Sequence, residues 1–337
     1  MARASAQSEE IQQETYTPAP VLGHDESKKL VRTLIASGKM PHGILLHGPR
    51  GIGKRLFAEN LAWGLICGFD PARPDDIQHN PDSKLAPVMA HGAHAGFGVL
   101  MPEKSVIRVQ DVREQIAQLA LASEGWRVVV VDAADDMTSA AANALLKTLE
   151  EPLGHTLLIL ISHAPSKLLP TIISRCRKVR LSPLAKPELD EVLTNSLGMN
   201  VPERIRKMAD GAPGRAVYLN ENAGKALEVM DSFFEGMAHG RPQDPFVTTE
   251  HLLAATPEAT SLFDVVLWLL AEKARSYAGD GNRHLAFQWG QAHQRAQQIV
   301  ADQQEYNLTP QLAFEKILSD ILTVRDNHAQ PQPEHIK

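Results

Sequence analysis

A short apolar run, a glycine-rich loop and a helical pattern follow one another in the first third of the chain. Residues 43–47 form the apolar run, residues 48–55 read Gly-Pro-Arg-Gly-Ile-Gly-Lys-Arg, and apolar side chains then recur at helical spacing up to Cys67. A strand that leads through such a loop into a helix is the setting of a phosphate-binding loop, whose backbone N–H groups surround phosphate oxygens. The order predicts an α/β domain with a phosphate loop at its centre.

The loop is complete except at its last position. Its candidate phosphate-binding residues are Gly48, Gly51, Gly53 and Lys54. A working loop ends in Ser or Thr, whose hydroxyl binds Mg²⁺, whereas this chain has Arg55. A guanidinium has no oxygen to offer a metal and carries a positive charge. The exchange favours a loop kept for folding over a loop that binds nucleotide with Mg²⁺.

A second part of a hydrolytic site is also altered. Residues 127–132 read Arg-Val-Val-Val-Val-Asp, a buried-strand run that ends in a carboxylate able to organise Mg²⁺, Asp132. Many hydrolysing NTPases carry a Glu next, to orient the attacking water, and this chain has Ala133. The two losses together predict that the chain does not hydrolyse ATP. Asp135 and Asp136 are expected to cap the helix that follows.

The surrounding residues alternate between strand and helix patterns. Besides 43–47 and 127–132, strands are expected at 106–109, 156–162 and 178–181, with helices at 112–122 and 138–151. This alternation predicts a parallel sheet in an α/β domain. The stretch 68–104 is rich in Pro, Gly, His and Asp without any period, and we expect an irregular insertion there.

After Pro183 the expected elements are all helices, separated by Gly and Pro breaks. Short helical segments at 187–197, 202–209 and 214–220 precede a Pro/Gly break at 240–245, and longer amphipathic helices follow at 249–255, 258–277, 285–304 and 309–326. We therefore expect an α/β domain over 21–184, a small helical domain over 185–240 and a larger helical domain over 245–326. Residues 1–20 are expected to be a flexible leader and 327–337 a tail.

Composition excludes several classes of protein. The 337 residues carry a net charge of −6, which argues against coating nucleic acid by bulk charge but leaves room for a local basic face. The two cysteines, Cys67 and Cys176, cannot build a disulfide framework. No window holds the roughly 18 apolar residues of a membrane helix, and the polar start is unlike a signal peptide. These features predict a cytoplasmic protein without membrane partners.

Three further groups of polar residues are functional candidates. His79, His91 and His94 lie in the irregular stretch without regular spacing, so a solvated loop is favoured over a metal site. Lys147, Glu150 and Glu151 form a charged cluster, for which the plain interpretation is the solvated face of a helix. The tripeptide 174–176, Ser-Arg-Cys, ends the α/β block, where an arginine could stabilise charge on a phosphoryl group bound by another subunit.

Two of these segments carry a family resemblance. Residues 143–152 read Asn-Ala-Leu-Leu-Lys-Thr-Leu-Glu-Glu-Pro, and residues 169–176 read Leu-Pro-Thr-Ile-Ile-Ser-Arg-Cys. Together they resemble the AAA+ subunits of bacterial DNA polymerase III clamp loaders, and the altered phosphate loop makes the chain most similar to the delta-prime subunits among them. The resemblance is strong over 42–184, and beyond it the helical segments agree only in length and class.

The resemblance implies an AAA+ domain, a three-helix lid and a helical collar that joins other clamp-loader subunits in a hetero-pentameric ring. Within that ring Arg175 would be an arginine finger, with Ser174 and Cys176 completing its motif. The chain would contact the sliding clamp and primer–template DNA through the complex. The complex is part of a DNA-directed DNA polymerase, a nucleotidyltransferase, but this chain would not itself catalyse DNA synthesis. Gly214, followed by Arg215, stands at the position of the lid's ATP-sensing arginine.

The resemblance also sets expectations for cofactors and leaves alternatives open. No cofactor would be required, although residual binding of ATP or ADP is left open. The four-cysteine zinc module of many relatives should be absent, because only Cys67 is present in that region. One alternative is an active AAA+ ATPase, such as the motor subunit of the same loader, against which Arg55 and Ala133 argue. Another is a P-loop kinase, for which no acceptor site is visible.

Overall fold

The computed structural model describes residues 15–102, 106–121, 125–255 and 259–329 and divides into two compact units. The first unit comprises Met1–Met199 with Asp210–Gly214, and the second comprises Asn200–Ala209 with Arg215–Lys337. Residues of the expected small helical domain, 185–240, fall in both units, and the boundaries given above stay a prediction. No helix within the described ranges combines the length and the apolar character that a membrane crossing needs.

The first unit is built on a five-stranded parallel sheet with strand order β2-β3-β4-β1-β5. The strands are β1 (Gly43–His47), β2 (Phe97–Leu100), β3 (Arg127–Asp132), β4 (Thr156–Ser162) and β5 (Arg177–Arg180). The register pairs Gly43 of β1 with Leu158 of the central β4, and Arg127 of β3 with Thr156. This arrangement confirms the α/β fold class with a parallel sheet.

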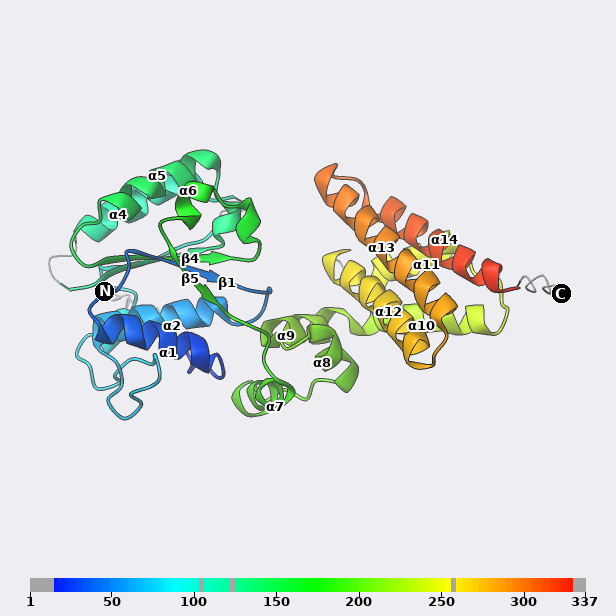
Figure 1. Ribbon diagram of the computed structural model, residues 1–337, viewed down its shortest axis with the longest axis horizontal. Helices are drawn as coiled ribbons and strands as arrows, with labels where there is room; N and C mark the ends of the chain where they lie inside the picture. Colours follow the sequence, from blue (N-terminus) through cyan, green and yellow to red (C-terminus); the bar gives the residue numbers. More distant parts are fainter. Residues whose placement is uncertain (1–14, 103–105, 122–124, 256–258, 330–337) are drawn as a thin grey trace, which may run out of the picture. The chain divides into compact units, whose positions relative to one another are not determined.

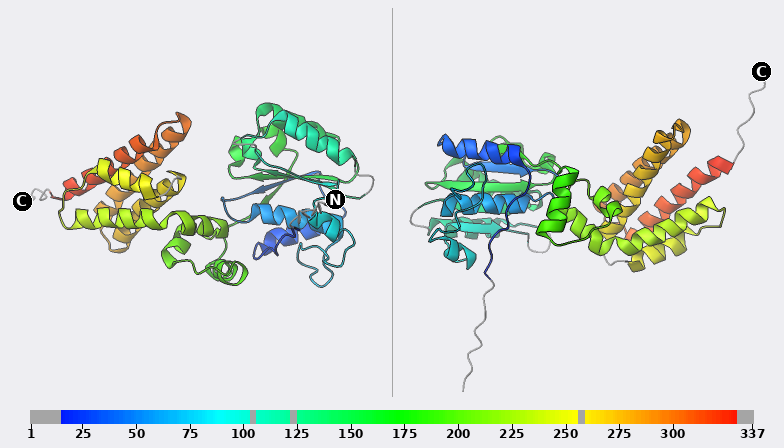
Figure 2. Two further views of the ribbon diagram at one scale, coloured as in Figure 1. Left: turned by 180° about the vertical axis from the view of Figure 1, so that it is seen from behind. Right: turned by 90° about the horizontal axis from the view of Figure 1, so that it is seen from below.

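Helices cover both faces of this sheet (Figures 1 and 2). One face packs on α1 (Asp25–Ala36) and α2 (Lys54–Cys67), and the other on α4 (Val109–Ala120), α5 (Ser139–Glu150) and α6 (Pro170–Ile173). Alternate residues of a strand point to opposite faces, so in β4 Ile159 joins the first core and Leu158 the second. A strand covered on both sides must be apolar at every position, which explains the uninterrupted run in β4.

The expected strand at 106–109 was wrong, and the strand β2 lies earlier, inside the stretch expected to be irregular. Ile107 makes only an isolated bridge to Met137, and α4 already begins at Val109. Gly98 of β2 lies where a Cβ atom would come within 2.0 Å of the Gln115 side chain of α4. The amide end of Gln115 thus packs directly over Gly98, and a glycine in the middle of a short strand hides the strand pattern. The same stretch holds a short helix, α3 (Ala86–Ala90).

The rest of the stretch 68–94 is held to α1 and α2 by aromatic and polar contacts. The rings of Trp63 and His79 lie 4.8 Å apart, and the Arg32 guanidinium lies 4.5 Å from the Phe69 ring centre. Arg32 Nε also donates to the carbonyl of Pro74 at 2.9 Å. Among the described residues no group of three or more His, Cys, Asp or Glu side chains could hold a metal. The absence of zinc from this chain stays a prediction.

Two further segments complete the first unit and seven helices, within the described ranges, make up the second. The first unit includes α7 (Lys186–Glu191) and a π-helical turn (Val192–Ser196). The helices that lie wholly or mostly in the second unit are α8 (Glu203–Ala209), α9 (Pro213–Asn222), α10 (Gly224–Ala238), α11 (Pro245–Ala255), α12 (Ala259–Gly279), α13 (Arg283–Glu305) and α14 (Pro310–Ala329). Helix α10 occupies a stretch for which the sequence analysis assigned no helix.

The second unit has its own apolar core. Helix α13 packs against both α12 and α14, and α11 packs against α14. Phe263 of α12 and Phe314 of α14 stack with ring centres 4.2 Å apart. In α10 the buried residues Ala226, Met230 and Phe233 recur at helical spacing, so the helix could have been predicted from the apolar pattern. The all-helical character expected after Pro183 is confirmed.

Candidate functional site

The phosphate loop connects β1 to α2 as predicted. Gly48 approaches another backbone so closely that a Cβ atom there would lie 2.2 Å from the carbonyl oxygen of Leu181, which follows β5. Gly53 directly precedes α2 in the left-handed region (φ 98°), which glycine adopts without strain. The loop therefore keeps the backbone geometry that places N–H groups around the start of a helix.

The ammonium group of Lys54 donates hydrogen bonds to the backbone of the phosphate loop. Its Nζ donates to the carbonyl oxygens of Gly48 (2.8 Å) and Pro49 (2.7 Å), and the residue is 3% exposed. Burial lowers the pKa of Lys54 to about 8, while the nearby Asp132 and Asp135 carboxylates act in the opposite direction. The ammonium group that would reach β- and γ-phosphates is thus satisfied by the two carbonyls at the start of its own loop.

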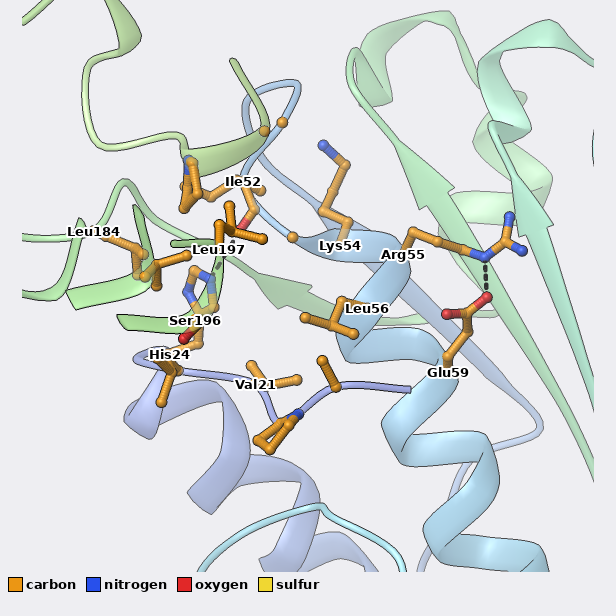
Figure 3. Close-up of a pocket in the computed structure, with 18 of the residues that line it drawn as sticks. Val21, His24, Ile52, Lys54, Arg55, Leu56, Glu59, Leu184, Ser196 and Leu197 are labelled. Atoms are coloured by element: carbon orange, nitrogen blue, oxygen red, sulfur yellow. Dashed lines mark hydrogen bonds and ion pairs between the residues drawn. The ribbon is translucent and has the colours of Figure 1, made fainter. Parts of the chain in front are cut away.

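Arg55 forms ion pairs with two carboxylates. Its Nε lies 2.5 Å from Oε1 of Glu59, one turn further along α2, and its Nη1 lies 3.4 Å from Oδ2 of Asp132. Figure 3 shows Lys54 and Arg55 leaving the start of α2 in different directions, with Arg55 turned toward Glu59. Glu59 is 6% exposed in its side chain and also accepts a hydrogen bond from the Tyr16 hydroxyl. The carboxylate that would organise Mg²⁺ is therefore neutralised by an arginine.

These residues do not fit a magnesium-bound nucleotide. Magnesium requires oxygen ligands in near-octahedral geometry, and the loop offers a guanidinium where the hydroxyl ligand belongs. A cation placed next to Asp132 would also meet the positive charge of Arg55. The network extends to Tyr16, whose pKa is raised well above its usual value by burial and by its hydrogen bond to Glu59. Sequence analysis missed Tyr16 and Glu59, although the i, i+4 spacing of Arg55 and Glu59 on a helix was a usable signal.

A pocket of about 560 Å³ adjoins the loop within the first unit. Its apolar part is lined by Val21, Ile52, Leu184 and Leu197, and its polar end by Lys54, Arg55 and Asp132 (Figure 3). His24 and His163 also line it, and burial lowers the pKa of both imidazoles. The His24 Nε2 lies 3.1 Å from the carbonyl oxygen of Ile52, where the imidazole N–H donates. A partly open, largely apolar pocket therefore lies beside the phosphate loop.

Gly214 also lines this pocket and brings no side chain to it. Its backbone N–H donates to the carbonyl of Gly51 in the loop at 2.8 Å. A Cβ atom at this position would lie 3.1 Å from the Cα atom of Gly51, so glycine permits the close approach. The adjacent Arg215 pairs instead with Asp264 of α12 at 3.4 Å.

The expectation that Asp135 caps the following helix was wrong. Helix α5 is capped by Thr138, whose hydroxyl accepts from the backbone N–H of Ala141 at 3.2 Å. Asp135 lies in a 3-10 turn (Ala134–Asp136) and accepts hydrogen bonds from the end of β4. Its donors are the Ser162 hydroxyl at 2.7 Å and the backbone N–H groups of His163 and Ala164. The carboxylate thus ties the end of β4 to the segment after β3, beside Lys54 and Asp132.

Arg175 lies just after α6 and contributes nothing to the pocket lining. Its Nη2 lies 2.7 Å from Oε1 of Glu150, the last residue of α5. Its Nη1 donates to the carbonyl of Thr171 at 3.1 Å and lies 3.4 Å from the Ser174 hydroxyl. The side chain is 38% exposed. The neighbouring Cys176 is buried, and burial raises the pKa of its thiol to about 11.

The structure brings the predicted phosphate-loop residues together with Asp132, and it places Arg175 away from them. Gly48, Gly51, Gly53, Lys54 and Asp132 gather at the carboxyl ends of β1 and β3, where parallel sheets place their binding sites. Arg175 occupies an exposed position beside the ends of α5 and α6. The roles of both groups stay predictions.

Comparisons with known proteins agree with the resemblance in the sequence. A family model described as "DNA polymerase III, delta subunit" matches residues 23–185. DNA polymerase III subunit delta' of Pseudomonas aeruginosa is 45% identical over 139 residues, which cover 40% of this chain and 41% of that protein. DNA polymerase III subunit delta' of Escherichia coli strain K12 is 30% identical over 235 residues, which cover 68% of this chain and 67% of that protein.

One solved structure spans most of the chain. A DNA polymerase III gamma-subunit-related protein from Thermotoga maritima is 16% identical, with a TM-score of 0.44, and the match covers 89% of this chain and 99% of that one. The alignment with the Pseudomonas protein leaves more than half of that protein's length unmatched, whereas the alignment with the Escherichia coli protein extends over two thirds of it. On the strength of the family model and of these relatives, the chain belongs to the DNA polymerase III delta-prime subunit family.

Proposed function

We propose that this chain is a non-hydrolysing subunit of a DNA polymerase III clamp loader, in which Arg175 acts on the ATP bound by a neighbouring subunit. The observation that carries the proposal is the contrast in the first unit between a phosphate loop neutralised by its own side chains and an arginine left at the surface. A guanidinium supplied in trans stabilises the charge that develops on a transferred phosphoryl group. The chain would thus promote hydrolysis without performing it.

The loss of hydrolysis is supported by three positions around the loop. Arg55 pairs with Asp132 where a metal ligand is needed, and Ala133 cannot orient a water molecule. Gly214 reaches the loop through its backbone only. Each change removes a different part of the machinery, namely the metal, the attacking water and a positive charge on the phosphates. No nucleotide cofactor is required for the proposed role, because the arginine supplied to the neighbour lies outside the pocket.

The partners follow from the family and from the resemblance. The relatives are named as subunits of DNA polymerase III, so the proposed partners are the other clamp-loader subunits of a hetero-pentameric ring. The sliding clamp and primer–template DNA would be engaged through that complex. The second unit, with its separate core of packed helices, is suited to the collar of such a ring.

Replacing Arg175 by alanine tests the proposed function. In a loader reconstituted with its partner subunits, Arg175→Ala should lower DNA-stimulated ATP turnover at least about tenfold, because transition-state charge stabilisation is lost. Assembly, followed by gel filtration, should be unchanged, since the side chain is exposed. Arg177→Ala is the matched control, because Arg177 is an exposed arginine in β5. Wild-type turnover in an assembled Arg175→Ala complex would refute the role of Arg175.

A further inference from the structure

We propose that Glu150 is a positioning residue that holds the Arg175 guanidinium ready for a neighbouring subunit, an inference that rests on the proposed function of Arg175. The two residues belong to the two separate motifs that carried the family resemblance. In the structure an ion pair joins those motifs, with Nη2 of Arg175 2.7 Å from Oε1 of Glu150. The plain interpretation of Glu150 as one residue of a solvated helix face does not account for this contact.

The guanidinium is held at two of its three nitrogens. Nη1 donates to the Thr171 carbonyl of α6, and the Ser174 hydroxyl lies 3.4 Å from the same atom. Nη2 faces Glu150 at the end of α5. Among the described residues, Nε has no hydrogen-bond partner. The arrangement fixes the plane of the guanidinium against two helix ends and leaves one nitrogen to bind outside the chain.

The ion pair is placed where it can orient a side chain without being needed for folding. Glu150 is 49% exposed and Arg175 is 38% exposed, whereas the core contacts of α5 are made by buried residues such as Leu145 and Leu149. Exposed ion pairs contribute little to the stability of a fold. The contact therefore affects the position of the arginine more than the stability of α5.

An ordered arginine reduces the entropy that must be lost when it meets a phosphate. A free arginine side chain samples many rotamers, and restricting it in advance lowers the cost of a productive contact. A carboxylate on the far side of the guanidinium provides this restriction, in the way that outer carboxylates orient other functional side chains. Glutamine has the same size but lacks the charge, so it tests the ion pair with little change in shape.

The experiment measures ATP turnover of the reconstituted loader that carries Glu150→Gln. We expect a kcat about two- to fivefold lower, the scale of an exposed ion pair, with an unchanged KM for ATP. Glu151→Gln is the matched control, since Glu151 is the adjacent exposed glutamate, and it should leave kcat unchanged. In an Arg175→Ala background, Glu150→Gln should have no further effect, because the residue acts only through the arginine.

The outcomes separate this inference from the proposed function. If Arg175→Ala itself leaves turnover unchanged, the proposed function fails, whatever Glu150 does. If Arg175→Ala lowers turnover while Glu150→Gln matches wild type, the positioning role alone is overturned. An increase in kcat with Glu150→Gln would also overturn it, because Glu150 would then be restraining the arginine. A loss of equal size in wild-type and Arg175→Ala backgrounds would show a merely structural role.

Discussion

Arg55 and Arg175 carry the same guanidinium in opposite settings within one unit. The Arg55 side chain is 34% exposed, and two carboxylates, those of Glu59 and Asp132, balance its charge at the start of α2. Arg175 has one carboxylate partner, lies at the surface and keeps Nε without a partner among the described residues. A charge that is satisfied internally stabilises the chain that contains it, whereas a charge left partly unsatisfied at the surface is available to another molecule.

The phosphate loop keeps its glycines and its lysine beside this ion network, and it adjoins a pocket of about 560 Å³. Arg55 occupies the position of the hydroxyl ligand and pairs with Glu59 and Asp132. Under the proposed function, hydrolysis would be lost through changed side chains at Arg55, Ala133 and Gly214 while the α/β fold is kept.

Lysine substitutions give the sharpest contrast between the two arginines. Arg175→Lys keeps the positive charge but loses the planar fork that binds phosphate and carboxylate oxygens in pairs. We expect turnover of the reconstituted loader to fall nearly as far as in Arg175→Ala, at least about tenfold. Arg55→Lys in the same assay should change turnover by less than about twofold, because its role is confined to the neutralised loop. Similar losses from both substitutions would contradict the division of roles.

Arg55→Thr should reopen the phosphate loop to magnesium. The hydroxyl restores a ligand, and removal of the guanidinium frees Asp132 to organise the metal. In isothermal titration with ATP we expect binding at least about tenfold tighter with Mg²⁺ than with EDTA, a difference of about 1.4 kcal/mol. Hydrolysis should stay absent, since Ala133 and Gly214 are unchanged.

The control for this exchange is Arg50→Thr. Arg50 is an exposed arginine of the same loop, so its loss removes the same charge away from the metal position. It should leave binding insensitive to magnesium. If Arg55→Thr and Arg50→Thr behave alike, net charge rather than the metal position controls the site, and the assignment of Arg55 as an internal replacement for the metal is wrong.

Much of the first unit could be predicted from the sequence because its signals are local. The apolar runs of β3 and β4 are uninterrupted, since both faces of a central parallel strand are buried. Strand β2 was missed because it is only four residues long, Phe97–Leu100, and contains Gly98, which breaks the apolar pattern. The expected strand at 106–109 failed for the related reason that β-branched residues there precede a helix and form only one bridge.

The candidate site divides in the same way. Lys54 and its glycines were identified by spacing along the chain, which a motif records. The partners of Arg55 could be predicted only in part: Glu59 follows from the helical repeat, whereas Asp132 and Tyr16 are brought to it by the fold. Asp135 was assigned to a helix cap because acidic residues favour that position. In the structure its carboxylate accepts hydrogen bonds from the end of β4 and not from the N–H groups of α5.

Asp135→Asn tests whether the hydrogen bonds that Asp135 accepts from the end of β4, beside the phosphate loop, stabilise the fold. The carboxylate accepts from Ser162 and from the backbone of His163, and an amide would turn N–H groups toward at least one of these donors. We expect a loss of about 1 kcal/mol in the free energy of unfolding, measured by urea denaturation. Asp136→Asn, one residue on, is the control and should change it by less than half as much. Equal effects would mean that the hydrogen bonds of Asp135 contribute nothing particular.

Acidification should lower the free energy of unfolding by less than Asp135→Asn does, through two histidines that line the pocket. Burial lowers the pKa of His24 and of His163, both of which line the pocket beside the phosphate loop. Between the lowered pKa of the folded protein and the usual value near 6.5, the unfolded chain binds more protons than the folded one. Stability is then fully present above about pH 6.5 and falls as the pH drops below it. The urea midpoint should therefore be lower at pH 5.5 than at pH 7.5.

The double variant His24→Gln, His163→Gln isolates this contribution. Glutamine can still donate to the Ile52 carbonyl at position 24, and neither replacement titrates in this range. The variant should lose less stability than wild type between pH 7.5 and pH 5.5. The contacts of Arg175 include no histidine, so Arg175→Ala should show the wild-type dependence on pH. If the double variant loses as much stability as wild type between pH 7.5 and pH 5.5, protonation of His24 and His163 does not destabilise the fold. The loss of stability at low pH would then come from other groups.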